Sequence, residues 1–167
     1  MQRALSALVA GVTTAGIAAP ASAALRVSDG LTFTRPDGSR VDPARDVRVW
    51  CGPWEPDVPV RAVHVRVGTA VAGAWSLSAV VADVRRRPVV HLPNDFVFDH
   101  PHGALLFAND GSNELSSAEE EATGTIRFGR VRCGRRLRVT FTVRATLGSE
   151  VSGPPLTVRG RFTARTG

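Results

Sequence analysis

Apolar and polar residues alternate along most of the chain beyond residue 30, and this pattern predicts β-strands. The clearest run is 137–145, in which Leu, Val, Phe, Val and Ala alternate with Arg and Thr. A period of two places successive side chains on opposite faces of a strand. The other predicted strands are 31–34, 47–51, 60–67, 75–84, 104–108, 123–133 and 156–163, with brief apolar runs at 89–92 and 96–98.

Turn residues punctuate these runs, and one segment has a helical signature. Gly52–Pro59 carries three prolines and predicts a loop, because proline cannot donate to the interior of a sheet. In 116–122, Ser116 with Glu119, or Ser117 with Glu120, fits a capping box and predicts one short helical turn. We therefore expect an all-β fold, an antiparallel β-sandwich of immunoglobulin-like architecture with eight or nine short strands. An up-and-down barrel is the main alternative.

The first 23 residues have the layout of a secretory signal peptide. Arg3 precedes an uncharged, mostly apolar stretch, and Ala21-Ser22-Ala23 fits a small-residue cleavage site. The stretch is short for a membrane span, and no later segment is apolar enough to cross a bilayer. We expect cleavage after Ala23, secretion, and a single mature domain over 24–167; a retained N-terminal anchor is the alternative.

The chain has two cysteines, Cys51 and Cys133, and each is followed by glycine in an Arg-Val-x-Cys-Gly sequence. In an exported protein, a disulfide is the default use of such a pair. We therefore predict a Cys51–Cys133 bridge that joins two distant strands. Two unpaired buried thiols are the alternative.

The formal net charge is +6, and all 21 basic residues are arginine. A strong positive charge favours adhesion to anionic partners outside the cell, such as cell-wall polymers. Nucleic acid is not expected, because secretion separates the protein from it and few aromatic residues accompany the arginines. The clusters around 85–87 and 130–138 predict either a solvated sheet face or a surface that binds an anionic envelope polymer.

The segment 91–102 is the best candidate for metal binding. It combines His91, Asp95, Asp99, His100 and His102, and imidazole with carboxylate suits zinc or copper. A polar loop between strands is the alternative. The oxygen-rich run 109–114 lacks the ligand spacing of an EF-hand and predicts a hairpin turn.

Trp50 and Trp54 lie on either side of Cys51, and Arg132 and Arg135 lie on either side of Cys133. The predicted bridge would bring these four residues to one end of the domain as a candidate binding surface. The tryptophans either form an exposed recognition patch or pack beneath the proline-rich loop.

No nucleophile elbow or phosphate-binding glycine loop is present, so no catalytic residue and no cofactor are expected. The sequence predicts a secreted, non-enzymatic module that binds an anionic envelope polymer or another secreted protein. The alternative is a small extracellular metal-binding protein or hydrolase that uses the His91–His102 loop.

Overall fold

The computed structural model describes residues 24–94, 99–149 and 152–167. Its strands, in chain order, are β1 (Leu25–Asp29), β2 (Thr32–Thr34), β3 (Arg40–Val41), β4 (Val47–Glu55), β5 (Val58–Val67), β6 (Trp75–Val80), β7 (Val89–Leu92), β8 (Ala104–Asn109), β9 (Glu114–Ser116), β10 (Thr123–Phe128), β11 (Arg138–Ser149) and β12 (Leu156–Thr166). A single short helix, α1 (Val81–Arg86), connects β6 to β7 in the described part of the chain.

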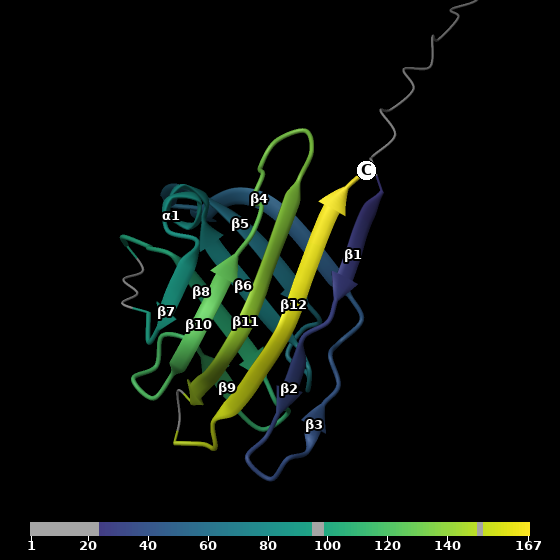
Figure 1. Cartoon of the computed structure of the whole chain (residues 1–167), viewed down its shortest axis with the longest axis vertical. Coiled ribbons are helices and arrows are strands. Elements are labelled where there is room, and N and C mark those ends of the chain that lie inside the picture. Colours follow the sequence, from purple (N-terminus) through teal and green to yellow (C-terminus); the bar gives the residue numbers. More distant parts are fainter. Residues whose placement is uncertain (1–23, 95–98, 150–151) are drawn as a thin grey trace, which may run out of the picture.

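The strands lie in two groups, one in front of the other in Figure 1. We call β7, β10, β11, β12, β1, β2 and β3 the front layer, and β4, β5, β6, β8 and β9 the back layer. β11 joins the two: Arg138–Leu147 pairs with β12 in the front layer, and its last residues, Gly148 and Ser149, pair with β9. By hydrogen bonding the strands therefore form one 12-stranded sheet, and each strand pair is antiparallel.

An all-β, antiparallel fold with one disulfide is confirmed, and the strands outnumber the eight or nine expected. β1, β3 and β9 account for much of the difference, and β3 and β9 have only two and three residues. Strands so short carry too few alternating positions to be recognised in the sequence. The immunoglobulin-like sandwich stays a prediction.

The predicted helix at 116–122 is wrong. Ser116 ends β9, and the residues after it form bends and a turn. Ser117 Oγ does not cap a helix, because it accepts a hydrogen bond from the Leu106 amide of β8 at 2.9 Å. The helix lies instead at Val81–Arg86, inside a segment predicted as strand, where Val81 and Val84 face the core one turn apart.

The predicted loop at Gly52–Pro59 is also wrong. β4 continues through Pro53 to Glu55, and only Pro56 and Asp57 form the turn to β5. Proline is tolerated there because β4 is an edge strand, and the pairing register shifts between Pro53 and Glu55.

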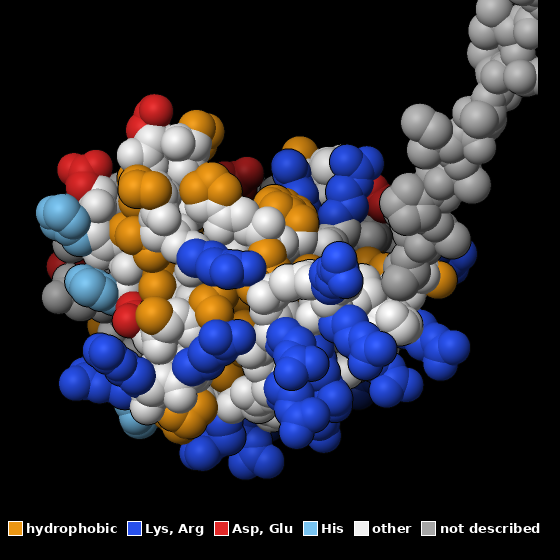
Figure 2. Space-filling view, turned by 90° about the horizontal axis from the view of Figure 1, so that it is seen from above, with side chains coloured by type: hydrophobic (Ala, Val, Ile, Leu, Met, Phe, Trp, Pro, Cys, Tyr) orange, Lys and Arg blue, Asp and Glu red, His pale blue; other side chains and the backbone are white. Residues whose placement is uncertain are grey.

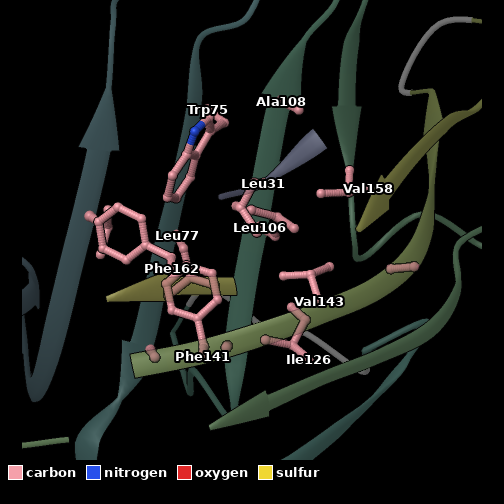
Figure 3. Packing of buried hydrophobic residues seen from close by; sticks show 14 of the residues in the cluster. Leu31, Trp75, Leu77, Leu106, Ala108, Ile126, Phe141, Val143, Val158 and Phe162 are labelled. Atoms are coloured by element: carbon pink, nitrogen blue, oxygen red, sulfur yellow. The ribbon is translucent and has the colours of Figure 1, made fainter. Parts of the chain in front are cut away.

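The core lies between the two layers, and aromatic rings connect them (Figure 3). Trp75 of the back layer meets Phe141 and Phe162 of the front layer edge-on, at centroid distances of 6.0 and 5.2 Å. Phe141 and Phe162 stack on each other at 5.2 Å. The apolar residues of 137–145 point into this core as the alternation predicted, so the Arg and Thr residues between them face outward.

Candidate functional site

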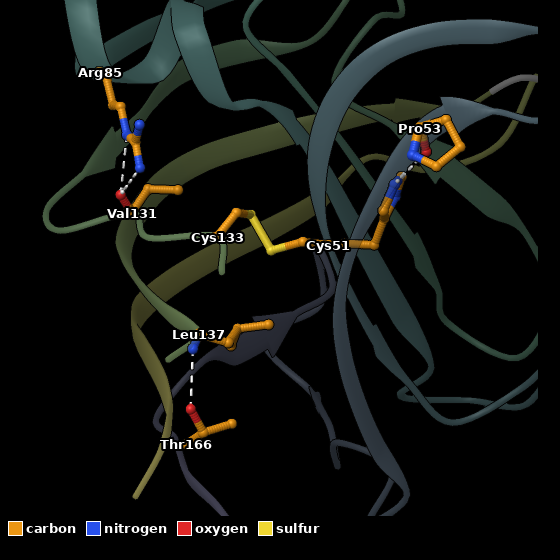
Figure 4. Close-up of a disulfide and its surroundings, with 8 residues drawn as sticks. Cys51, Pro53, Arg85, Val131, Cys133, Leu137 and Thr166 are labelled. Atoms are coloured by element: carbon orange, nitrogen blue, oxygen red, sulfur yellow. Dashed lines mark hydrogen bonds between the residues drawn. A yellow bond between two sulfur atoms is a disulfide. The ribbon is translucent and has the colours of Figure 1, made fainter. Parts of the chain in front are cut away.

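The predicted disulfide is confirmed. Cys51 on β4 is bonded to Cys133, with the Cα atoms 5.8 Å apart and a sequence separation of 82 (Figure 4). Cys133 lies in the segment 129–137, between β10 and β11. The bond therefore attaches an irregular segment of the front layer to the edge strand of the back layer.

Two further contacts hold this segment (Figure 4). Arg85 of α1 donates from Nε and Nη2 to the Val131 carbonyl at 3.1 and 3.0 Å. The Leu137 amide donates to Thr166 Oγ1 of β12 at 2.9 Å. With Val131 and Leu137 also buried, the exposed arginines of the segment project from a fixed backbone.

Four arginines lie side by side across the front layer. Arg26 of β1 is opposite Arg165 of β12, and Arg165 is opposite Arg138 of β11. Arg138 in turn forms an isolated bridge with Arg132, through backbone hydrogen bonds of 2.7 and 2.9 Å. We call Arg26, Arg165, Arg138 and Arg132 the arginine row. Directly paired residues of neighbouring strands lie about 5 Å apart, so their guanidinium groups share one small region.

The rest of the outward front-layer surface is built mostly from threonine and arginine. A row of threonines crosses it near the far end of the strands, with Thr34, Thr157, Thr146 and Thr123 directly paired. Between these two rows, Arg159 is opposite Arg144. The only described carboxylate on these strands is Asp29, and it is turned inward, where it accepts hydrogen bonds from the Leu31 amide and Trp75 Nε1. The outward face of the described front-layer strands thus carries positive charge without a negative partner.

The arginine row borders a hollow of about 450 Å³, which Arg130 and Arg136 also line. The Nε atom of Arg138 is buried and has no hydrogen-bond partner among the described residues. Figure 2 views this end of the molecule and shows arginine side chains crowded over the lower half of the view, with acidic side chains mostly in the upper part. None of the six arginines forms an ion pair with a described residue.

The arrangement suits an anion. Like charges directly opposite each other on a sheet destabilise it, and an unpaired buried donor costs further free energy. An anionic ligand would relieve both effects, because guanidinium groups bind phosphate, sulfate and carboxylate through paired N–H donors. Six arginines around one hollow are therefore equipped for polyvalent anion binding.

The candidate surface of Trp50, Trp54, Arg132 and Arg135 is brought together only in part. Arg132 belongs to the arginine row, and Arg135 is exposed in the same segment. Trp54 is buried in a small cluster with Ala62, Val80 and Leu105 on the outer side of the back layer. Trp50 is 44% exposed, and it faces away from the front layer because Cys51, the next residue, points inward.

Trp50 covers His64 of β5. The two rings stack with their centroids 5.0 Å apart and an interplanar angle of 17°. His64 alternates onto the outward face of its strand, yet it is only 6% exposed because Trp50 and Trp54 lie against it. This burial was not predicted from the sequence, since it depends on which strand pairs with β5.

Both imidazole nitrogens of His64 have partners. Nε2 lies 3.0 Å from the Pro53 carbonyl, and Nδ1 lies 2.8 Å from Ser78 Oγ. A carbonyl oxygen can only accept, so Nε2 carries the hydrogen and Nδ1 accepts from the Ser78 hydroxyl. Burial lowers the pKa of His64, and the hydrogen bond to Pro53 opposes that shift. The ring is therefore a neutral, fixed support for Trp50.

The predicted metal residues are dispersed where the structure describes them. His91 on β7 and His102 line the same hollow with Asp83, whose Oδ2 lies 3.6 Å from His102 Nδ1. His100 is exposed and does not line that hollow, and Asp95 lies outside the described residues. Among the residues that the structure places, no three His, Cys, Asp or Glu side chains are arranged so that together they could hold a metal ion. Metal binding by this loop stays a prediction.

The oxygen-rich run at 109–114 spans the hairpin connection from the last residue of β8 to the first residue of β9. Asp110 Oδ1 accepts from the amides of Ser112 and Asn113, both at 2.8 Å. Its carboxylate is thus used within the turn, as expected for a hairpin connection.

No helix among the described residues is long and apolar enough to cross a membrane. The predicted signal peptide, 1–23, lies outside the described residues, so secretion stays a prediction with which the disulfide is compatible.

The arginine row was not predicted, although part of the information that specifies it is present in the sequence. The alternation of arginine and threonine in β11 and β12 shows that both strands carry positive charge on one face. The alignment of Arg26, Arg165, Arg138 and Arg132 depends on the registers of three strand pairings, which alternation alone does not fix. Comparison of the chain with protein-family models, with curated proteins and with solved structures finds no match.

Proposed function

We propose that this protein is a secreted, non-enzymatic binding module that adheres to an anionic polymer of the cell envelope through its front layer. The observation that carries the proposal is the arginine row, in which three arginines on adjacent strands and Arg132 beside them lie in register, with no carboxylate on the outward face of the described front-layer strands. A polymer with repeated negative charges can contact several rows of this surface at once. Its affinity then comes from many modest charge contacts.

The lining of the hollow supports binding more than catalysis. Arginine remains charged at any physiological pH and cannot act as a general base. The residues around the hollow are six arginines with Leu137, Thr166 and Gly167, so none supplies an acid–base group that titrates near neutrality. The side chains at this end of the described chain can hold and neutralise an anion.

The test is binding to isolated cell-wall material and to a soluble polyphosphate, measured over a range of salt concentrations. The variant Arg26→Gln/Arg132→Gln/Arg165→Gln removes three exposed members of the arginine row. Arg45→Gln/Arg61→Gln/Arg86→Gln is the matched control, since it removes the same charge from exposed positions outside the row.

We expect the row variant to bind at least about tenfold more weakly at low salt, with a shallower dependence of affinity on salt. The control variant should retain most of the affinity. Equal losses in the two variants would show that net charge alone is responsible, and binding that does not depend on salt would contradict the proposal.

The alternative function, metal binding through the His91–His102 loop, is favoured by one observation, which is that His91 and His102 line the same hollow. Calorimetric titration of the protein and of its His100→Ala/His102→Ala variant with zinc tests it directly. Heat that is present in the parent protein and lost in the variant would favour this alternative.

A further inference from the structure

Trp50 differs from the other two tryptophans in its exposure. Trp54 and Trp75 are 8% and 2% exposed, whereas Trp50 is 44% exposed. One face of its indole lies on the imidazole of His64, nearly parallel to it, so the opposite face is the one available to solvent. The back layer thus presents one flat aromatic surface.

This aromatic surface is held in place before any ligand arrives. His64 is itself fixed by Ser78 Oγ and the Pro53 carbonyl, and Trp54 lies against its ring as well. A ring already stacked on a fixed support loses little conformational freedom on binding. Gly52, two residues further along the same face, has no side chain; its backbone lies beside the indole, since an added Cβ there would be 3.7 Å from Trp50 Cδ1.

The size of the surface favours a ring-sized ligand over a protein. The other exposed large apolar residues among those described are Leu25 and Val27 on β1 and Val71 in the β5–β6 turn. None of them lies on β4 or β5, so among the described residues of these two strands the indole is the one large apolar side chain that is exposed. A protein partner needs a contiguous surface of several hundred Å² with an apolar centre, which a single indole does not supply.

The neighbours of Trp50 are hydrogen-bond donors. Arg48 precedes it by two residues on the same face of β4, and Arg66 is directly opposite Arg48 on β5. Their Cα atoms therefore lie one row from that of Trp50, about 7 Å along the strand. Arg48 is within 3.7 Å of Asp46, and both side chains are exposed.

We propose that Trp50 is the stacking surface of a saccharide-binding site. A pyranose ring presents C–H groups on its face and hydroxyl groups around its edge. The C–H face matches the free face of the indole, while Arg48 and Arg66 can donate hydrogen bonds to the hydroxyl groups at the edge. The site is distinct from the arginine row, because it lies on the outer side of the back layer, and the inference does not rest on the function proposed above.

The experiment uses the fluorescence of the native protein. Trp50 is the exposed tryptophan, so acrylamide quenching reports mainly on its free face. Cellohexaose, hexa-N-acetylchitohexaose and maltohexaose serve as uncharged probes, and oligogalacturonate serves as the charged one. All four are titrated at low salt and at about 1 M salt, where charge interactions are screened within about 3 Å.

We expect at least one uncharged oligosaccharide to protect Trp50 from acrylamide, equally at both salt concentrations. Trp50→Ala should lose about tenfold or more in affinity by calorimetry, and Trp50→Phe should keep part of it. Arg26→Gln/Arg132→Gln/Arg165→Gln should bind the saccharide unchanged, which separates this site from the arginine row.

Three results would overturn the inference. They are no protection by any uncharged oligosaccharide, unchanged affinity in Trp50→Ala, and protection by oligogalacturonate alone that disappears at high salt. The quenching measurement is made on the unaltered chain, so the inference remains testable if Trp50→Ala fails to fold.

Discussion

Arg138 and Arg165 lie directly opposite each other on β11 and β12, the two most extensively paired strands of the front layer. Threonine is the more frequent outward residue on β11, so the pairing of two arginines is not forced by the composition of the strand. Directly opposed like charges destabilise a sheet by up to about 1 kcal/mol. The pairing should therefore lower the stability of the free protein, and an anion bound as proposed above would offset that loss.

Arg165→Gln should increase the free energy of unfolding by about 0.5 kcal/mol at low salt and weaken binding to an anionic polymer. The stabilisation should shrink as salt is added, because screening already reduces the repulsion. Chemical denaturation at two salt concentrations measures it. Arg161→Gln is the control, since Arg161 is exposed on the same strand and face but is opposite Thr142. A loss of stability in Arg165→Gln would contradict the interpretation.

Alternation and cysteine count were sufficient to predict part of this structure. The inward positions of 137–145 were predicted correctly, because each outward neighbour is polar and the period of two is unbroken. The Cys51–Cys133 bond was predicted because the chain offers no other pairing.

The predictions that failed concern features that depend on contacts between distant segments. Ser117 has the sequence environment of a helix cap, but its hydroxyl is taken by the Leu106 amide on β8. His64 has the alternation of an exposed residue, but Trp50 of the neighbouring strand covers it. In both cases a contact with a residue of another strand overrides the local preference, and the local sequence does not indicate which residue that will be.

The Cys51–Cys133 bond should be the largest single covalent contribution to stability. Closing a loop with a sequence separation of 82 restricts the unfolded chain by about 4–5 kcal/mol in the loop-entropy model. Cys51→Ala/Cys133→Ala should lower the free energy of unfolding by up to that amount, measured by urea titration.

A reducing agent supplies the control for this prediction. It should shift the unfolding midpoint of the parent protein towards that of the double variant and leave the variant unchanged. A parent protein whose midpoint is insensitive to complete reduction would show that the bond contributes little.

Gly160 of β12 should not tolerate a side chain. Its φ of +133° is one that L side chains rarely adopt, and an added Cβ would collide with the Gly30 carbonyl, between β1 and β2. Gly160→Ala should therefore destabilise the protein by more than about 1 kcal/mol in thermal or urea unfolding. Gly38→Ala is the matched control, because Gly38 also has a positive φ but no atom within 4 Å of the added Cβ. A cost no greater than that of the control would mean that the β1–β2 connection adjusts freely.

His64 should make stability depend on pH in the mildly acidic range. Its pKa in the folded state is lowered, first by burial, while in the unfolded chain it returns to about 6.5. Between these two values the unfolded state binds more protons than the folded state, so acid favours unfolding. The free energy of unfolding should be independent of this group above about pH 6.5 and should decrease as the pH falls from there to the folded-state pKa.

Urea unfolding at a series of pH values, compared between the parent protein and His64→Gln, measures this contribution. The variant should lose the part of the slope that belongs to His64, whereas His91→Ala, which alters an exposed histidine, should keep it. Parallel pH profiles in the parent and His64→Gln would contradict the assignment of a neutral, buried imidazole.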